Sequence, residues 1–267
     1  MPETGGLYYE ERGPAGAPPV ILSPGLGGSA SYWAPNLDSL AADHRVILYD
    51  HRGTGRSDRA LPPKLTVDDM ADDVLALMDG LGLRGASLIG HAAGGAIGLA
   101  IALRAPERLD RLVVINGWSR PDPHFARCME TRLALLRDSG VAAFVRAQPL
   151  FLYPARWISE NIARLDAEEP GQIAHFQGVA NVEARIAALR AFDVDADLGR
   201  IRTPILLIAA EDDMLVPASC SERLAGRLPN ATLTPMLGGH ACNVTEPVIF
   251  DKILRGWLSP ALLQGAA

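Results

Sequence analysis

The sequence predicts an α/β protein with a mostly parallel, doubly wound sheet and an inserted helical cap, and two observations support this. Short apolar runs bounded by Gly, Pro or Asp alternate with longer helical patterns, which is typical of βα units on a parallel sheet. Strand patterns are absent between about Gly117 and Asp197, where helical patterns are broken at Gly and Pro. We therefore expect residues 1–116 and 198–267 to form the core and residues 117–197 the cap.

Seven strands are expected from these apolar runs. Six are parallel, and Leu7–Arg12 makes an antiparallel edge; the parallel ones are Val20–Ser23, Arg45–Tyr49, Ala86–Gly90, Arg111–Asn116, Ile205–Ala209 and Thr232–Met236. The best-defined helix begins after Thr66, an N-cap residue, with two aspartates in the first turn. Its apolar residues recur at a spacing of 3.6 and should face the sheet: Val67, Met70, Ala71, Val74, Leu75, Met78 and Leu81.

Composition and charge narrow the class of partner. The chain has 267 residues, 48% of them hydrophobic and 21% charged, which suits one globular core with a lid. A net charge of -6 argues against nucleic acid or an anionic membrane as partner. The first residues lack an apolar signal segment, and the longest apolar stretch, Ala92 to Leu103, is too short to span a bilayer. We expect a cytoplasmic protein that binds a small molecule, with a homodimer left open.

Metal and cofactor motifs are missing from the sequence. Three widely spaced cysteines, Cys128, Cys220 and Cys242, fit neither a disulfide framework nor a metal knuckle. The six histidines lack the pairing of a zinc site, and no phosphate-binding glycine loop occurs. We therefore expect no metal and no cofactor.

The segment Gly90-His91-Ala92-Ala93-Gly94 follows a strand and opens a small-residue helix. That is the pattern of a nucleophile elbow, in which glycines flank a residue held in a strained turn. By register the residue at the turn is Ala92, which has no nucleophilic atom. Any tight strand-to-helix crossover could give the same glycine spacing, so the elbow is weak evidence when taken alone.

Two later segments supply an acid and a histidine in the order that follows an elbow. Asp213 comes after a predicted strand and four residues before Pro217, with Asp212 as its rival for the role of acid. His240 follows Gly238-Gly239 after the last predicted strand. An oxyanion hole should come from the backbone amides of Ala93 and of Leu26, the latter in a glycine-rich loop.

Taken together, these features resemble the α/β-hydrolase superfamily over nearly the whole chain, although Pro24 stands where that superfamily often has histidine. Four segments are more specific and are similar to the RutD-type proteins of the bacterial Rut pathway for uracil: Asn116–Trp118, Gln148–Ala155, Ala174–Gly178 and Gly238–Thr245. The resemblance implies hydrolysis of a small labile product of pyrimidine degradation, carbamate or 3-aminoacrylate. It also implies that alanine at the elbow can be native to the group.

Because Ala92 has no nucleophilic atom, an acyl-enzyme at this position is excluded. The catalysis that remains without a nucleophile is small, so the substrate must already be labile. We expect His240, oriented by Asp213, to act as general acid and base on a water molecule. Cys242 is an alternative nucleophile two residues from His240, whereas packing or turn roles suit His91, Ser23 and Ser29 better.

Substrate contacts are expected from polar and aromatic residues, most of them in the cap: Trp118, Gln148, Tyr153, His175 and Asn243. The rival interpretation is that such residues tie the cap helices together. Two other functions stay open. One is a non-catalytic homologue that binds a small acid, and the other is an esterase or lactonase inactivated at the elbow.

Overall fold

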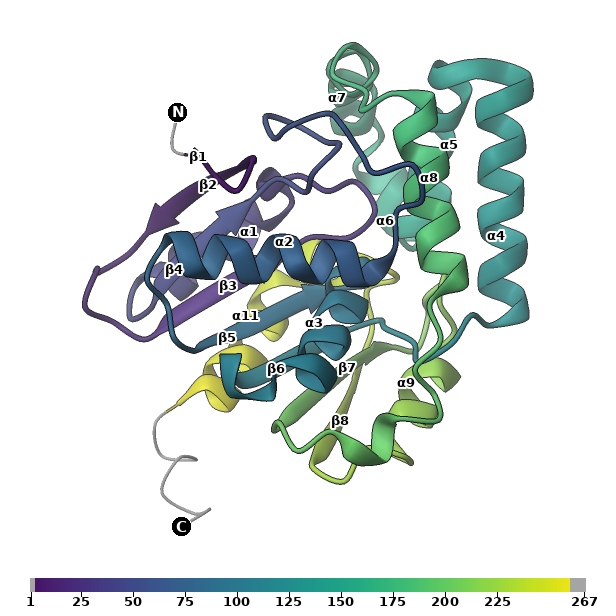
Figure 1. The fold of residues 1–267 in the computed structure, drawn as a ribbon. Coiled ribbons are helices and arrows are strands. Elements are labelled where there is room, and N and C mark those ends of the chain that lie inside the picture. Colours follow the sequence, from purple (N-terminus) through teal and green to yellow (C-terminus); the bar gives the residue numbers. More distant parts are fainter. Residues whose placement is uncertain (1–2, 260–267) are drawn as a thin grey trace.

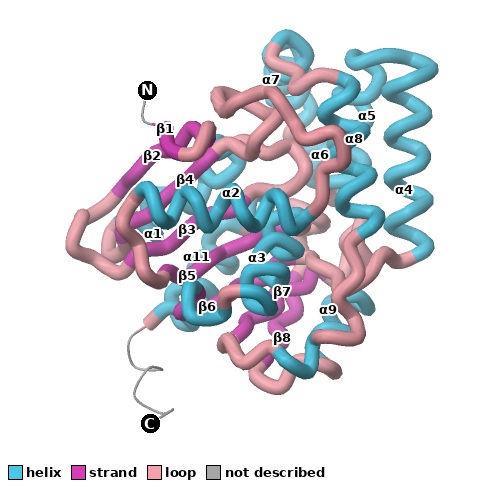
Figure 2. Tube along the Cα trace, viewed as in Figure 1, coloured by secondary structure: helices cyan, strands magenta, loops and turns pink. Residues whose placement is uncertain are grey.

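An eight-stranded sheet runs through the computed structural model, which describes residues 3–259 (Figures 1 and 2). Its order is β1-β2-β4-β3-β5-β6-β7-β8; β1 and β2 are antiparallel to their neighbours, and the remaining pairs are parallel. The strands are β1 (Glu3–Thr4), β2 (Leu7–Arg12), β3 (Pro19–Ser23), β4 (Arg45–Tyr49), β5 (Ala86–His91), β6 (Leu109–Ile115), β7 (Ile205–Ala210) and β8 (Ala231–Met236).

The predicted mostly parallel, doubly wound sheet is present, and each of the seven predicted strands is found with its ends shifted by at most two residues. One detail is wrong, because Leu7–Arg12 is antiparallel but is not the edge of the sheet. The short strand β1 covers it. Two residues are too few to produce a period-two apolar pattern, so the sequence carries no signal for this strand.

Helices cover both faces of the sheet (Figure 1). On one face lie α2 (Val67–Gly80), α3 (Ala93–Arg104) and α9 (Ala218–Ala225); on the other lie α1 (Ala34–Ala41), α10 (Cys242–Thr245) and α11 (Pro247–Leu258). Helix α2 starts as expected, with a capping box between Thr66 and Asp69. Its buried stripe includes Leu77, whereas Leu75 is only partly buried.

Between β6 and β7 the chain forms five α-helices and no strand: α4 (Pro123–Ala134), α5 (Gly140–Leu152), α6 (Ala155–Glu160), α7 (Ile162–Ala174) and α8 (Val179–Ala191). A π-helical turn, Leu135–Ser139, joins α4 to α5, and short 3-10 turns occur at Ala30–Trp33, Pro106–Arg108 and Leu198–Arg200. The five helices stand together beside the sheet (Figure 1), where the sequence predicts the cap; the exact limits of the cap stay a prediction. Within residues 3–259, no helix has the length and apolar character needed to cross a membrane.

Candidate active site

The turn between β5 and α3 has the geometry of an elbow. Ala92 adopts φ 48° and ψ -102°, a conformation that costs a non-glycine residue about 1–3 kcal/mol. Two glycines allow the tight crossing, because a methyl group on Gly90 would collide with Gly94, and one on Gly94 would collide with the carbonyl oxygen of Ser23. The chain therefore builds the strained turn of a nucleophile but places only a methyl group there.

His240 and Asp213 form a buried pair at the ends of β8 and β7. His240 Nδ1 lies 2.7 Å from Asp213 Oδ2, and the two side chains are 3% and 0% exposed. The other carboxylate oxygen accepts hydrogen bonds from the backbone N–H groups of Leu215 (2.7 Å) and Val216 (2.9 Å). This geometry fixes the direction of the imidazole ring and leaves Nε2 for chemistry.

Asp212, the rival acid, has a different task. Its Oδ1 accepts the backbone N–H groups of Gly238 (3.0 Å) and Gly239 (2.9 Å). Both glycines have positive φ, 123° and 70°, so the chain turns sharply just before His240. Asp213 orients the histidine side chain, and Asp212 holds the loop that carries it.

Two further residues hold the His240 backbone, and the sequence did not identify them for this task. Both Asn116 Nδ2 and His91 Nε2 lie 2.8 Å from the carbonyl oxygen of His240. Asn116 Oδ1 also accepts the N–H of Ala210. Asn116 has φ 48°, a region in which asparagine is enriched. An asparagine at the end of a strand is therefore the one signal that the sequence could have offered. Burial, together with the nearby His240, keeps the pKa of His91 well below its usual value, so His91 is a neutral donor.

The predicted oxyanion groups lie on two elements. The Ala93 amide is in the first turn of α3, where N–H groups have no acceptor within the helix. Leu26 lies in the loop after β3, and its carbonyl oxygen accepts from Arg185 Nε (3.3 Å) and Nη2 (3.2 Å). The amide roles of Ala93 and Leu26 stay a prediction, but a cap arginine clearly fixes the loop.

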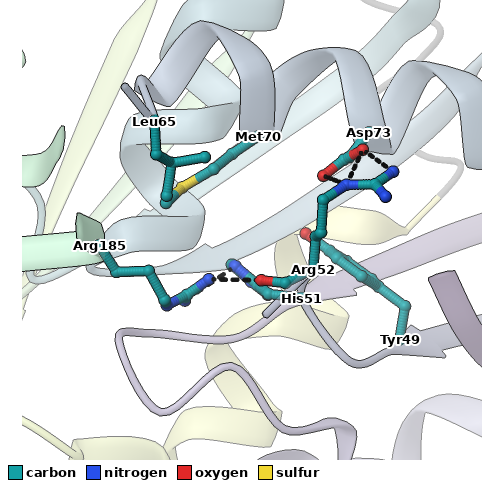
Figure 3. A pocket seen from close by; sticks show the side chains of 7 residues that line it. All are labelled: Tyr49, His51, Arg52, Leu65, Met70, Asp73 and Arg185. Atoms are coloured by element: carbon teal, nitrogen blue, oxygen red, sulfur yellow. Dashed lines mark hydrogen bonds and ion pairs between the residues drawn. The ribbon is translucent and has the colours of Figure 1, made fainter. Parts of the chain in front are cut away.

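Arg185 of α8 contacts four residues although it is only 1% exposed. Besides Leu26, it donates to the carbonyl oxygens of Gly25 (3.5 Å) and Arg52 (3.4 Å) and to His51 Nδ1 (3.1 Å). Figure 3 shows Arg185 and His51 next to the Arg52–Asp73 ion pair. The cavity between them has a volume of about 10 Å³, space for about one water molecule, so it is no substrate site.

The loop after β4 is braced by two separate ion pairs. Arg52 pairs with Asp73 at 2.6 Å, and Asp50 pairs with Arg56 at 2.8 Å. Ser23 has the structural role the sequence indicates, because its Oγ lies 2.6 Å from Tyr49 OH. Ser29 likewise caps the turn Ala30–Trp33.

Burial disfavours the thiolate form of all three cysteines. Burial raises the pKa of Cys242 to about 12 and that of Cys220 to about 11, and it also raises the pKa of Cys128. All three are therefore thiols at neutral pH, and thiols are poor nucleophiles. The described part of the chain also contains no group of three or more His, Cys, Asp or Glu side chains placed to hold a metal ion.

The predicted substrate residues of the cap are found in three settings. Trp118 is 2% exposed and packs on Phe125, with no acceptor for its indole N–H among the described residues. Gln148 accepts a hydrogen bond from Arg132, and Tyr153 packs on Trp157. His175 is exposed, and its Nδ1 lies 2.9 Å from the carbonyl oxygen of Gly171, one turn back in α7. The contacts of His175 fit the end of a helix better than a substrate pocket.

The assignment of Asn243 to substrate needs correction. Asn243 is fully buried; its Oδ1 accepts from Tyr32 OH (2.6 Å), and its Nδ2 donates to Asn36 (3.1 Å). Both ends of the amide are already used in a network that joins α10 to α1 and the turn before it. Its closeness to His240 in the sequence gave no information on the direction of its side chain.

Strand order, a strained turn after β5, an acid after β7 and a histidine after β8 place the molecule among the α/β hydrolases. The family model described as alpha/beta hydrolase fold matches residues 18–140. The crystal structure of the enol-lactonase from Burkholderia xenovorans LB400 is similar, with a TM-score of 0.86 and 26% identity over 96% of this chain and 98% of that one.

Sequence relatives give the narrower family. A protein of Caulobacter sp. (strain K31) named "Putative carbamate hydrolase RutD" is 58% identical over 95% of this chain and 96% of its own length. A protein of the same name from Agrobacterium fabrum is 51% identical over 96% of this chain and 99% of its own. The chain belongs to the RutD family of α/β hydrolases.

Proposed function

We propose that this protein hydrolyses the carbon–nitrogen bond of a small, labile product of pyrimidine degradation, carbamate or 3-aminoacrylate, without a covalent intermediate. The observation that carries the proposal is the buried His240–Asp213 pair, 2.7 Å apart, beside an elbow whose residue, Ala92, has no nucleophile. Family membership supports the substrate class, since the curated relatives are named for carbamate.

For 3-aminoacrylate, His240 would deliver a proton to the carbon next to the carboxylate, which converts the enamine to an electrophilic iminium. Water then adds to the iminium carbon while His240 takes up one of its protons. His240 passes that proton to nitrogen, and it takes the proton of the new hydroxyl group as ammonia leaves and the aldehyde forms. The products are 3-oxopropanoate and ammonia. For carbamate, proton transfer to nitrogen suffices, because the carbon–nitrogen bond then breaks to give ammonia and carbon dioxide.

The test is ammonia release from each substrate, compared between the protein, two variants and buffer. His240→Ala should reduce the rate to that of buffer, and Asp213→Asn should reduce it strongly because the imidazole loses its orientation. His175→Ala is the matched control, since this histidine is exposed on the cap. Equal rates for the protein and buffer would instead support the non-catalytic binding homologue.

An ester or lactone hydrolase is the second candidate, and the strained elbow favours it. Ala92→Ser places a hydroxyl at the turn, near the His240–Asp213 pair. A large gain of ester hydrolysis would support an esterase inactivated at this position. Little gain, with ammonia release retained, would support the proposed function.

A further inference from the structure

Arg132 of α4 is buried in the cap without a counter-ion. It is 4% exposed, and none of the ion pairs among residues 3–259 includes it. Its polar contacts are Gln148 Oε1 at 2.6 Å and the sulfur of Met129 at 3.7 Å, and its Nε–H has no acceptor. Two aromatic rings, Phe144 and Phe151, lie 5.4 and 5.6 Å from its guanidinium carbon.

A cation in this setting is costly to the folded protein. Burial lowers the pKa of Arg132 to about 10, so the side chain remains charged at neutral pH. An arginine has five N–H donors, and a buried charge is normally paired with a carboxylate or with several acceptors. One amide oxygen and one thioether sulfur do not meet that need. An anionic ligand would.

Arg132 also links two helices, α4 and α5, that contact the segments next to Asp213 and His240. One face of α4 contacts the segment after Asp213, because His124 Nε2 and Cys128 Sγ lie 2.8 and 3.5 Å from the carbonyl oxygen of Met214. The end of α5, which carries Gln148 and Phe151, contacts the His240 loop, because Leu152 O accepts the N–H of Ala241 at 3.0 Å. The guanidinium thus lies where the two helices that contact the acid and histidine segments meet.

We propose that Arg132 binds the carboxylate of the substrate. This inference rests on the proposed function for the reacting centre and narrows the substrate to a short acid whose carboxylate is separate from its carbon–nitrogen bond. In carbamate the carbon that bears nitrogen also bears both oxygens, so an anchor for those oxygens would have to lie against His240. The polar and aromatic contacts of Arg132 are with cap residues and not with the loops that carry Asp213 and His240, which favours a 3-aminoacrylate-like acid.

The test uses propionate as probe and propionamide as its uncharged match, with dissociation constants measured by calorimetry. The protein should bind propionate at least about tenfold more tightly than propionamide, since a charge-assisted contact contributes about 1.5 kcal/mol or more. Arg132→Met should abolish that preference and leave propionamide binding unchanged. Arg146→Met, an exposed arginine on the adjacent helix α5, is the matched control and should bind as the unmodified chain does.

A second measurement needs no apolar variant. In the unmodified chain the Arg132 Nε–H resonance, assigned by its loss in Arg132→Lys, should shift on addition of propionate. An unchanged resonance, or equal binding of propionate by Arg132→Met and the unmodified chain, would overturn the inference. Failure of the proposed function looks different: His240→Ala would then release ammonia at the unmodified rate while propionate binding still required Arg132.

Discussion

Two arginines of the cap are equally buried but differ in what surrounds them. Arg185 of α8 and Arg132 of α4 are 1% and 4% exposed, and burial lowers the pKa of each to about 10. Arg185 donates to three carbonyl oxygens and a histidine, all from the core. Arg132 has one amide oxygen and one sulfur, both from the cap. A buried arginine whose N–H groups have acceptors indicates a structural clamp. A buried arginine that lacks acceptors indicates a place for a ligand.

The comparison is tested most strongly by Arg185→Met. Removing this side chain leaves the buried carbonyl oxygens of Gly25, Leu26 and Arg52 without their charged donor, which should lower the free energy of unfolding by about 3 kcal/mol. Urea unfolding measures the change. Arg190→Met on the same helix is the control, because its pair with Glu130 is at the surface and contributes less than about 1 kcal/mol. Equal effects of the two variants would contradict the clamp.

Acid should lower the free energy of unfolding, because two histidines of the core, His51 and His91, are buried. Burial keeps the pKa values of His51, beside Arg185, and of His91 well below the ordinary value of about 6.5. As the pH falls below about 6.5 the unfolded chain binds protons that the folded chain does not, so stability is present above that pH and lost below it. Each histidine contributes at most about 1.4 kcal/mol per pH unit.

Unfolding measured between about pH 7.5 and 5.5 should show this loss. His51→Gln removes one of the two groups and should roughly halve the slope. His175→Ala, which changes an exposed histidine, should leave it unchanged. A free energy of unfolding that stays constant over this window would show that the two buried histidines are not held neutral.

Ala92→Gly should change stability less and in the opposite direction. Ala92 holds a positive φ that glycine adopts without strain, so the variant should gain about 1 kcal/mol in urea unfolding. Ammonia release should be unchanged, because the methyl group has no chemical role in the proposed mechanism. Asn116→Gly is the instructive partner: it relieves a similar φ but loses the bonds to His240 and Ala210, and should be destabilising.

The fold could be predicted well from the sequence because its signals are local. Apolar runs and the Thr66 cap are set by neighbours along the chain, and both are present as expected. The His240–Asp213 pair could also be predicted from the sequence, because both residues follow strands whose order is fixed in this fold. Spacing favoured Asp213 over Asp212 as the partner of His240, and Asp213 is the one that lies 2.7 Å from His240 Nδ1; its role as the acid stays a prediction.

What the sequence did not reveal depends on side-chain directions and on distant contacts. Asn243 is close to His240 along the chain, yet its amide points into a buried network. The contact of His91 with the His240 carbonyl joins residues 149 positions apart, and no local pattern encodes it. An arginine in an amphipathic helix is expected at the surface, so nothing marked Arg132 as buried.

The smallest expected effect on stability is the one that separates the two arginines. Replacing a buried ion that lacks a partner by an apolar side chain of similar length is often neutral or stabilising, because its desolvation cost disappears. Arg132→Met leaves Gln148 without a donor, which offsets part of that gain, so its free energy of unfolding should stay within about 1 kcal/mol of the unmodified chain. Urea unfolding beside Arg185→Met provides the measurement. A loss as large as that of Arg185→Met would mean that Arg132 holds the cap together, and its unused N–H would no longer indicate a ligand.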